Sequence, residues 1–351
     1  MVPVGMRRAG TITRLRWKLA SGGRHIMSTN TVGGLEISTF VSDVDGMGIY
    51  YRAWRPPCGV MTRATVQITH GIAEYSARYD RLARFLAAQG CVVYALDLRG
   101  HGQTAGPDKL GQLGTTAWDG MTADIKQLAD IARSENPGLP LVAFGHSMGS
   151  ALTQSHIENH GDILAGAVLC GTLGAVPGLA DEDSYREAMR QLKVLATGEQ
   201  AMAPSEYFGA SLAEFNAPFV AAGQPVSGSE WQTSDPEEIR RFQSDPLCGR
   251  PFSNAMTYSV LAGFHSLWMP ENESRVPVDL PILIIAGQED PVGGRTATIQ
   301  ALITRYMAHG HRRLAYRFYE GGRHEILNEA GKDRVHRDIG QWLTQVLETA
   351  S

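Results

Sequence analysis

One stretch decides the fold: PLVAFGHSMG, at residues 140–149. Its apolar half predicts a buried strand, and the residues that follow it are compatible with a helix. Between them Ser147 lies in a G-x-S-x-G pattern, which is typical of a serine nucleophile on a sharp strand-to-helix turn. Gly145 and Gly149 allow this turn, because a side chain at either position would collide with the neighbouring strand or helix. We therefore expect Ser147 to face a helix N-terminus, whose N–H groups stabilise a nearby oxyanion.

The composition is that of an ordinary globular protein with a sizeable core. The chain has 351 residues, of which 43% are hydrophobic and 19% are charged. This length suits one large α/β domain with an insertion, or two smaller domains. The net charge of −4 gives no reason to expect nucleic acid as a partner. No apolar run approaches the roughly 18 residues needed to span a bilayer.

The cysteines indicate the compartment. The chain has four, which are widely scattered and form no C-x-x-C pair: Cys58, Cys91, Cys170 and Cys248. Cys91 and Cys170 fall in apolar, strand-like runs and are interpreted as buried thiols. Buried thiols favour a reducing compartment, so we expect a cytoplasmic protein.

The N-terminal residues 1–35 form a basic leader. Six arginines and lysines lie there, and the first acidic residue is Glu36. Charge interrupts the apolar run that a secretory signal needs, which leaves a transit peptide or a basic arm for transient contact with a membrane or lipid surface. We favour a disordered leader, with Met27 as a candidate for the working initiator.

From about residue 36 apolar runs alternate with helical patterns. The runs predict eight strands, at 35–41, 47–54, 64–69, 91–96, 141–144, 163–169, 282–286 and 313–319. Helical patterns lie at about 77–89, 117–134, 148–160, 293–308 and 333–349. Most of these strands are apolar on both faces, which is typical of a parallel sheet covered by helices on both sides. We therefore predict an α/β core from residues 36–172 and 277–351.

Residues 173–276 break this alternation, because they contain no convincing buried strand. They are rich in Gly, Pro, Glu and aromatic residues. The insertion falls at the carboxyl edge of the sheet, where ligands bind in open α/β sheets. We interpret it as a mobile helical cap over an apolar pocket, although its aromatic residues also suit a small core of the insertion's own.

A serine nucleophile needs a histidine base that is oriented by a carboxylate. In a doubly wound hydrolase sheet these groups follow in the order serine, acid, histidine, each in a loop after a strand. Asp290 follows the strand at 282–286, and His324 follows the strand at 313–319. We therefore predict a catalytic triad of Ser147, Asp290 and His324.

Other residues compete for these roles. Glu289 is adjacent to Asp290 and stays open as the acid. Chain order argues against His101 and His146 as the base, and His146 is better interpreted as shaping the elbow. The remaining candidates lie away from the carboxyl ends of strands: His309, His311 and His336.

The oxyanion hole needs two backbone donors. One is the N–H of Met148, the residue after the nucleophile. The second is expected from the loop after the strand at 64–69, where Gly71 allows a close backbone approach. We therefore predict Ile72 N–H as the second donor, although His70-Gly71 also suits a plain strand-ending turn.

At this point the chain resembles a known family. It is similar, over roughly residues 45–350, to the monoacylglycerol lipase and lysophospholipase-like branch of the α/β-hydrolases, of the serine aminopeptidase S33 type. The resemblance is carried by five segments: HGIAEYSARY (70–79), DLRGHG (97–102), GHSMG (145–149), GQEDPV (287–292) and GRHEILNE (322–329). The first and last of these are far more specific than the elbow itself.

The resemblance implies an acyl tunnel beneath a cap, the triad and the two oxyanion donors predicted above. It also implies cleavage of carboxylic esters, often monoglycerides or lysophospholipids, with no metal and no organic cofactor. Two features depart from the family pattern. Position 72 is Ile where a small residue is common, and the basic leader has no counterpart.

The predicted function is that of a serine hydrolase that cleaves a small-molecule carboxylic ester through an acyl-enzyme. Acyl transfer to an acceptor other than water on the same triad is one alternative. A non-catalytic binding protein of the same fold is another, although such proteins usually lose a triad member. An aspartate nucleophile is disfavoured by Ser147, and nothing indicates the amine-recognising pocket of a peptidase.

Overall fold

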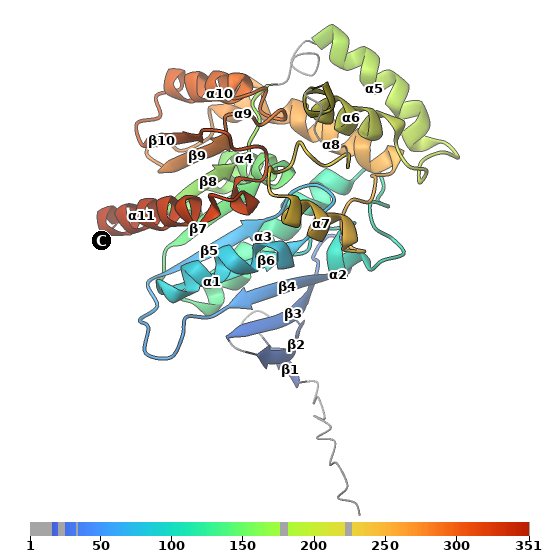
Figure 1. Ribbon diagram of the computed structural model, residues 1–351. Coiled ribbons are helices and arrows are strands. Elements are labelled where there is room, and N and C mark those ends of the chain that lie inside the picture. The colour runs from blue at the N-terminus through green and yellow to red at the C-terminus, as the bar shows by residue number, and fades with distance from the viewer. Residues whose placement is uncertain (1–15, 20–24, 33, 176–181, 222–226, 351) are drawn as a thin grey trace, which may run out of the picture.

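The computed structural model describes residues 16–19, 25–32, 34–175, 182–221 and 227–350. Within these residues the strands form one ten-stranded sheet in the order β1-β2-β3-β4-β6-β5-β7-β8-β9-β10 (Figure 1). The strands are β1 (Arg16–Leu19), β2 (His25–Val32), β3 (Leu35–Val41), β4 (Gly48–Trp54), β5 (Ala64–Thr69), β6 (Cys91–Leu96), β7 (Leu141–His146), β8 (Gly166–Cys170), β9 (Ile282–Gly287) and β10 (Leu314–Tyr319).

Helices connect these strands. The α-helices are α1 (Asp80–Ala88), α2 (Gly102–Ala105), α3 (Ala117–Glu135), α4 (Met148–His160), α5 (Glu182–Thr197), α6 (Glu206–Ala221), α7 (Pro236–Ser244), α8 (Asn254–Leu267), α9 (Pro270–Glu273), α10 (Ala297–Ala308) and α11 (Lys332–Ala350). Three short 3₁₀ turns also lie in the described ranges: η1 (Ser76–Tyr79), η2 (Gly161–Ile163) and η3 (Ile326–Asn328). None of the helices in this part of the chain is long and apolar enough to cross a membrane.

The sheet is parallel from β6 through β10, as the apolar runs predict. Neighbouring strands pair in parallel across β6-β5-β7-β8-β9-β10, and β4 pairs antiparallel with β6. Residues on β5 through β9 are buried throughout. Because parallel strands end at the same edge of a sheet, the loops after β5, β7, β9 and β10 meet there. The predicted α/β fold with its mostly parallel sheet is confirmed.

Two further strands extend the antiparallel edge. β1 pairs with β2, and β2 pairs antiparallel with β3. The structure therefore places 16–19 and 25–32 in the sheet rather than in a disordered leader. Pairing explains this, since β3 would otherwise present a row of open backbone N–H and C=O groups. Residues 1–15 of the predicted leader lie outside the described residues.

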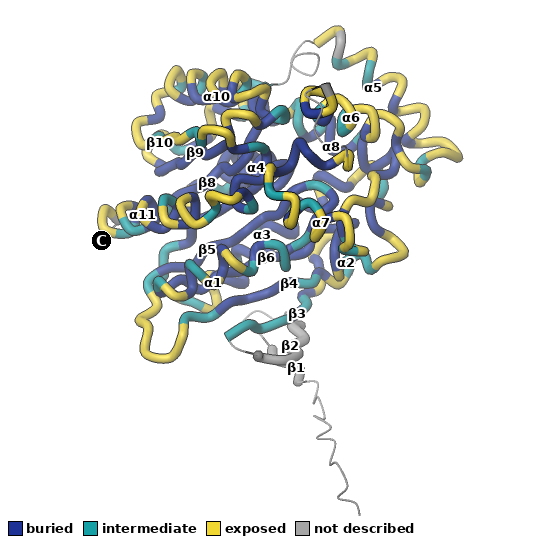
Figure 2. The backbone as a smooth tube through the Cα atoms, viewed as in Figure 1, coloured by how far each residue is buried: buried dark blue, intermediate teal, exposed yellow. Residues whose placement is uncertain are grey.

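Helices cover both faces of the sheet. On one face α1 and α11 pack their apolar sides against the strands, with Leu82, Leu86, Ile339 and Leu343 buried there. On the other face α3, α4 and α10 form the remaining core. In Figure 2 buried residues follow the strands through the middle of the molecule, and exposed residues lie on the outer sides of the helices.

Several element boundaries differ from the sequence expectation, and two of them show why. The helix expected at 293–308 begins only at Ala297, because Gly294, Arg295 and Thr296 all have positive φ, which a right-handed helix does not contain. The strand expected at 163–169 begins at Gly166, since residues 161–163 form a 3₁₀ turn. In both cases a turn occupies the start of an apolar pattern.

We call residues 173–276 the cap segment. Helices α5 to α9 lie in it, between β8 and β9 in the chain, and α5, α6 and α8 gather at one end of the sheet (Figure 1). Helix α8 packs on α5 as well as on α3 and α4 of the core. Its start is set by Ser253, whose side chain accepts a hydrogen bond from Met256 N. The division of the chain into core and cap stays a prediction.

The glycines beside Ser147 have little space around them. A Cβ built at Gly145 would lie 2.2 Å from Gly149 O, and one at Gly149 would lie 2.2 Å from Thr69 O. Both distances are far below any real Cβ contact, so helix α4 approaches β7 and β5 this closely only because residues 145 and 149 are glycines. The steric reason predicted for the two glycines is confirmed.

We expect Gly149→Ala to lower the free energy of unfolding by about 1–3 kcal/mol or more, because the new methyl group overlaps backbone atoms that cannot move aside. Urea unfolding followed by circular dichroism measures this loss. The matched control is Gly114→Ala, since a Cβ at Gly114 meets nothing within 4 Å. Equal stability of the two variants would contradict the steric argument.

Candidate active site

Ser147 lies on a strained turn between β7 and α4. Its backbone has φ 54° and ψ −125°, in a region that residues other than glycine rarely adopt. The turn is held by a hydrogen bond from Ser147 N to Cys170 O at 3.0 Å. Because Ser147 directly precedes the first residue of α4, its side chain lies at the N-terminal end of that helix.

Asp290 and His324 lie together at the same edge of the sheet. His324 Nδ1 is 3.0 Å from both carboxylate oxygens of Asp290. Asp290 is fully buried, and its Oδ1 also accepts a hydrogen bond from Val292 N at 2.9 Å. This contact fixes the carboxylate against its own loop. An Nδ1–H donated to the carboxylate leaves Nε2 as the proton-accepting atom of the ring.

Ser147 and His324 line one cavity of about 190 Å³. His324 Nε2 is buried and has no hydrogen-bond partner among the described residues, so Ser147 Oγ is not bonded to it here. In proteins without bound substrate such a contact is often long and tightens on binding. The remaining lining combines apolar side chains (Ile72, Phe208, Leu212, Trp231 and Phe242) with polar ones (Glu74, His146, Ser229, Gln232 and Glu325).

Four of the competing candidates lie elsewhere. Glu289 is half-exposed and its nearest charged partner is Arg295, at 3.6 Å. His309 lies 3.6 Å from Glu273, and the ring of His336 packs against Phe85. His309, His311 and His336 do not line the cavity that contains Ser147. The geometry therefore favours Asp290 and His324 over the alternatives.

The loop after β5 approaches the nucleophile closely. A Cβ built at Gly71 would lie 3.1 Å from Ser147 Cβ, so this backbone passes directly beside the serine. Ile72 follows and lines the cavity. Met148 is the first residue of α4, and the N–H groups of a first helical turn have no partner within the helix. Met148 thus directly follows Ser147, and Ile72 directly follows Gly71, whose backbone passes beside Ser147. The role of these two N–H groups as oxyanion donors stays a prediction.

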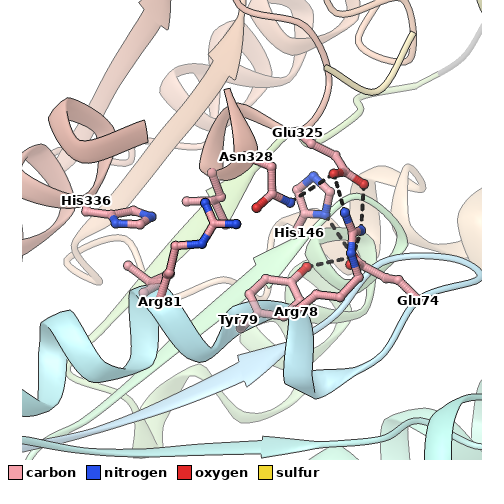
Figure 3. A pocket seen from close by; sticks show the side chains of 10 residues that line it. Glu74, Arg78, Tyr79, Arg81, His146, Glu325, Asn328 and His336 are labelled. Carbon is pink, nitrogen blue, oxygen red and sulfur yellow. Dashed lines mark hydrogen bonds and ion pairs between the residues drawn. The ribbon is translucent and has the colours of Figure 1, made fainter. Parts of the chain in front are cut away.

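Three of the polar residues that line the cavity belong to a larger group of mostly buried polar side chains, which we call the polar cluster. It consists of Glu74, Arg78, Tyr79, His146, Glu325 and Asn328, most of which are joined by dashed lines in Figure 3. Arg78 lies between two carboxylates, 2.8 Å from Glu74 and 2.7 Å from Glu325. Glu74 Oε1 accepts hydrogen bonds from Gly71 N and from Tyr79 OH, each at 2.7 Å. The cluster therefore ties the loop after β5 to the loop that carries His324.

Charge attraction outweighs burial for the ionisable groups of this cluster. Burial alone would raise the pKa of Glu74, but Arg78 and the hydrogen bond from His146 lower it. Arg78 lowers the pKa of Glu325 in the same way. Burial opposes the charge of Arg78, yet Glu325 and Glu74 keep its pKa well above the usual value. Both carboxylates and the guanidinium are therefore ionised at neutral pH.

A second connection joins the cap segment to the His324 loop. His324 N donates to Trp231 O at 3.3 Å, and Glu325 N donates to Gln232 O at 2.6 Å. Glu329 accepts hydrogen bonds from Ser234 N and from Arg323 N, each at 3.0 Å on Oε1. Two neighbouring backbone segments are thus held side by side. Residues 231–234 and 323–325 are therefore joined by backbone hydrogen bonds.

The charged residues of the polar cluster, together with Glu329, lie in segments that carry the family resemblance, but the sequence predicts no role for them. Glu74 and Arg78 belong to the segment at 70–79, and Glu325, Asn328 and Glu329 belong to the segment at 322–329. The four-residue spacing of Glu74 and Arg78 is the available signal, because acidic and basic side chains so spaced on a helical turn pair readily. Which carboxylate of the second segment meets Arg78 depends on tertiary contact, which spacing does not reveal. The described residues contain no group of three or more His, Cys, Asp or Glu side chains arranged to hold a metal ion.

Comparison with known proteins agrees with this fold. One curated relative is a monoacylglycerol lipase from Mycolicibacterium smegmatis, 26% identical over 309 residues, which covers 87% of this chain and 95% of the relative. Another is the monoglyceride lipase of Homo sapiens, 25% identical over 312 residues, with 88% and 90% covered. Among solved structures, a thermostable carboxyl esterase from Bacillus coagulans in complex with glycerol is 27% identical, with a TM-score of 0.80, and 90% of this chain and all of that chain are covered.

The family model for "Serine aminopeptidase, S33" matches residues 61–331. The match runs from just before β5 to the start of α11, and so includes Ser147, Asp290, His324 and the polar cluster. It covers well over half of the chain. This protein therefore belongs to the serine aminopeptidase S33 family of α/β-hydrolases.

Proposed function

We propose that this protein is a serine hydrolase that cleaves small carboxylic esters through an acyl-enzyme. The observation that carries the proposal is that Ser147 and His324 line one cavity while His324 Nδ1 is bonded to the buried Asp290. These are the parts that an activated serine needs: a strained, accessible hydroxyl, a base, and a carboxylate that orients the base. The esterase and lipase relatives support the same chemistry.

The reaction follows from these positions. Ser147 Oγ attacks the ester carbonyl as His324 Nε2 takes its proton, and Asp290 stabilises the imidazolium that results. The oxyanion accepts hydrogen bonds from Ile72 N–H and Met148 N–H. The intermediate then collapses, and the alcohol leaves with the proton from His324. Water attacks the acyl-enzyme with His324 again as base, and the carboxylic acid is released.

The cavity lining supports an ester with an apolar acyl chain and a small polar alcohol. The apolar lining residues named above are suited to the acyl chain, and the polar ones are suited to the alcohol. Several relatives are named for monoglycerides. We therefore propose monoglycerides as the preferred class, before lysophospholipids and simple short- or medium-chain esters.

We further propose transient contact with a lipid surface through the cap segment. Large apolar side chains are exposed on α5, on α6 and between them: Val194, Leu195, Met202, Tyr207 and Val220. Exposed apolar side chains on a segment that also lines the cavity favour contact with the lipid that supplies the substrate. A cytoplasmic location stays a prediction, supported by four cysteines that are all free.

A panel of monoglycerides and p-nitrophenyl esters of increasing chain length tests this function. We expect hydrolysis of both series, with higher kcat/KM for the glyceryl ester at matched chain length. Product analysis with an added alcohol distinguishes hydrolysis from acyl transfer, since transfer yields a new ester in place of free acid. Failure to cleave any ester of the panel would refute the proposal.

A further inference from the structure

The histidines near Ser147 differ in what their two ring nitrogens face. His70 Nδ1 lies 2.7 Å from Gly71 O, an acceptor, whereas His70 Nε2 accepts a hydrogen bond from Leu98 N at 2.9 Å. A neutral imidazole has one N–H and one acceptor nitrogen, so it satisfies both contacts. His101 has one such contact, from Nδ1 to Arg99 O at 2.8 Å. Neither ring requires a second proton.

His146 is different, because both of its nitrogens face acceptors. Nδ1 lies 3.2 Å from the carboxylate oxygen Oε1 of Glu74, and Nε2 lies 3.3 Å from the backbone carbonyl oxygen of His324. Neither oxygen has a proton to give, given that Glu74 is ionised beside Arg78. A neutral ring donates only once. Only an imidazolium donates to both oxygens.

The charge of the polar cluster leads to the same assignment. Its ionised groups other than His146 are the carboxylates of Glu74 and Glu325 and the guanidinium of Arg78, which together leave one negative charge uncompensated. All three side chains are almost completely buried. An unpaired charge in such a place is very unfavourable. A proton on His146 makes the cluster neutral.

The pKa shifts of the three histidines agree with a charged His146. Burial would lower the pKa of His146, but the hydrogen bond to Glu74 and the charge of Glu74 raise it above its usual value. The two neighbouring rings show the opposite result: burial lowers the pKa of His70 to about 4 and that of His101 to about 3. Among these three buried histidines His146 is therefore the one whose environment favours the charged form.

We propose that His146 is a buried imidazolium that holds the oxyanion loop and the His324 loop in register with Ser147. One N–H binds the backbone of the catalytic histidine. The other binds Glu74, which in turn holds Gly71 N beside the serine. His146 touches no substrate atom in this assignment, so it is a positioning residue. Its effect on turnover rests on the proposed ester hydrolysis, whereas its protonation does not.

Titratable groups face His146 from each element packed around it, and the proton of the ring depends on all of them. They are His70 and Glu74 after β5, Arg78 and Tyr79 in η1, Cys170 at the end of β8, and His324 and Glu325 after β10. Loss of the proton at alkaline pH removes one of the two donors. Because a neutral ring then loses its hydrogen bond to one of the two loops, we expect kcat to fall as His146 titrates.

NMR of the full-length wild-type protein labelled with ¹⁵N-histidine tests the protonation directly. We expect both ring nitrogens of His146 to carry a proton at neutral pH, and those of His70 to show one protonated and one bare nitrogen. His146→Gln assigns the resonance by its disappearance. One bare nitrogen on His146 at neutral pH would overturn the proposal, and the protonation itself is measured on the wild-type protein.

The pH dependence of kcat tests the positioning role. Wild type should lose kcat over the pH range in which NMR shows His146 losing its second proton. His146→Gln should have a kcat about ten- to a hundredfold lower at neutral pH, as expected for loss of a charge-assisted hydrogen bond, and no alkaline fall in that range. The control His101→Gln removes a nearby buried neutral ring and should keep the alkaline fall.

The outcomes separate the two proposals. A variant profile that parallels the wild-type profile would overturn the role of His146. Hydrolysis by a wild type whose His146 is singly protonated would refute this inference and leave the proposed function standing. Absence of ester hydrolysis with a doubly protonated His146 would refute the proposed function and leave the assignment of the charge standing.

Discussion

We expect Ser147→Ala to lower kcat for ester hydrolysis by about 10⁴-fold or more. Without Oγ no acyl-enzyme forms, and the base, the oxyanion donors and substrate binding retain only a small rate enhancement over water. The protein should fold normally, because Ala has no larger volume and the Ser147 backbone is held by Cys170 O rather than by its side chain. Single-turnover hydrolysis of a p-nitrophenyl ester measures the loss.

A fluorophosphonate probe gives an independent readout of the same change. Wild type should be labelled at Ser147, and Ser147→Ala should not be labelled. The matched control is Ser155→Ala, two turns along α4 and outside the cavity. Ser155→Ala should keep both the labelling and the activity. Equal labelling of wild type and Ser147→Ala would show that another residue is the nucleophile.

The second large effect is expected from Asp290→Asn, which should lower kcat by about 10⁴-fold. An amide group opposite His324 Nδ1 offers either a weaker acceptor or a donor, and the donor stabilises the tautomer that has its proton on Nε2. That tautomer cannot accept the proton of Ser147. Because the exchange preserves shape, KM and thermal stability should change far less than kcat.

Glu289→Gln is the control that separates the two acidic candidates. Glu289 has a half-exposed side chain whose weak partner is Arg295 at 3.6 Å, so its loss should change activity by less than about threefold. The roles would be reversed if Glu289→Gln abolished turnover and Asp290→Asn preserved it. Steady-state kinetics of the two purified variants at one pH decide between them.

The fold was predictable from sequence because its core obeys one simple rule. Strands that are apolar on both faces alternate with helices, and residues 64–69, 91–96 and 148–160 are found in the elements expected of them. The start of α10 was misjudged because Arg295 and Thr296 adopt positive φ, which no local pattern indicates. Strands β1 and β2 were missed because their pairing with β3 is a tertiary contact.

The candidate site was predictable to a different extent for each part. Chain order and strand ends led to Asp290 and His324, since parallel strands bring their following loops to one edge. The polar cluster was not predictable. Side chains from three separate parts of the chain meet there, and neither hydrophobic period nor spacing reveals which carboxylate faces Arg78 or which oxygen faces His146.

The hydrogen bonds between 231–234 and 323–329 have a mechanical consequence. Trp231 O and Gln232 O accept hydrogen bonds from His324 N and Glu325 N. A rigid movement of the whole cap segment would therefore draw His324 away from Ser147. If the cap segment opens while His324 stays beside Ser147, the moving part must therefore exclude residues 231–234. Substrate entry thus leaves the position of the catalytic base unchanged only if residues 231–234 do not move.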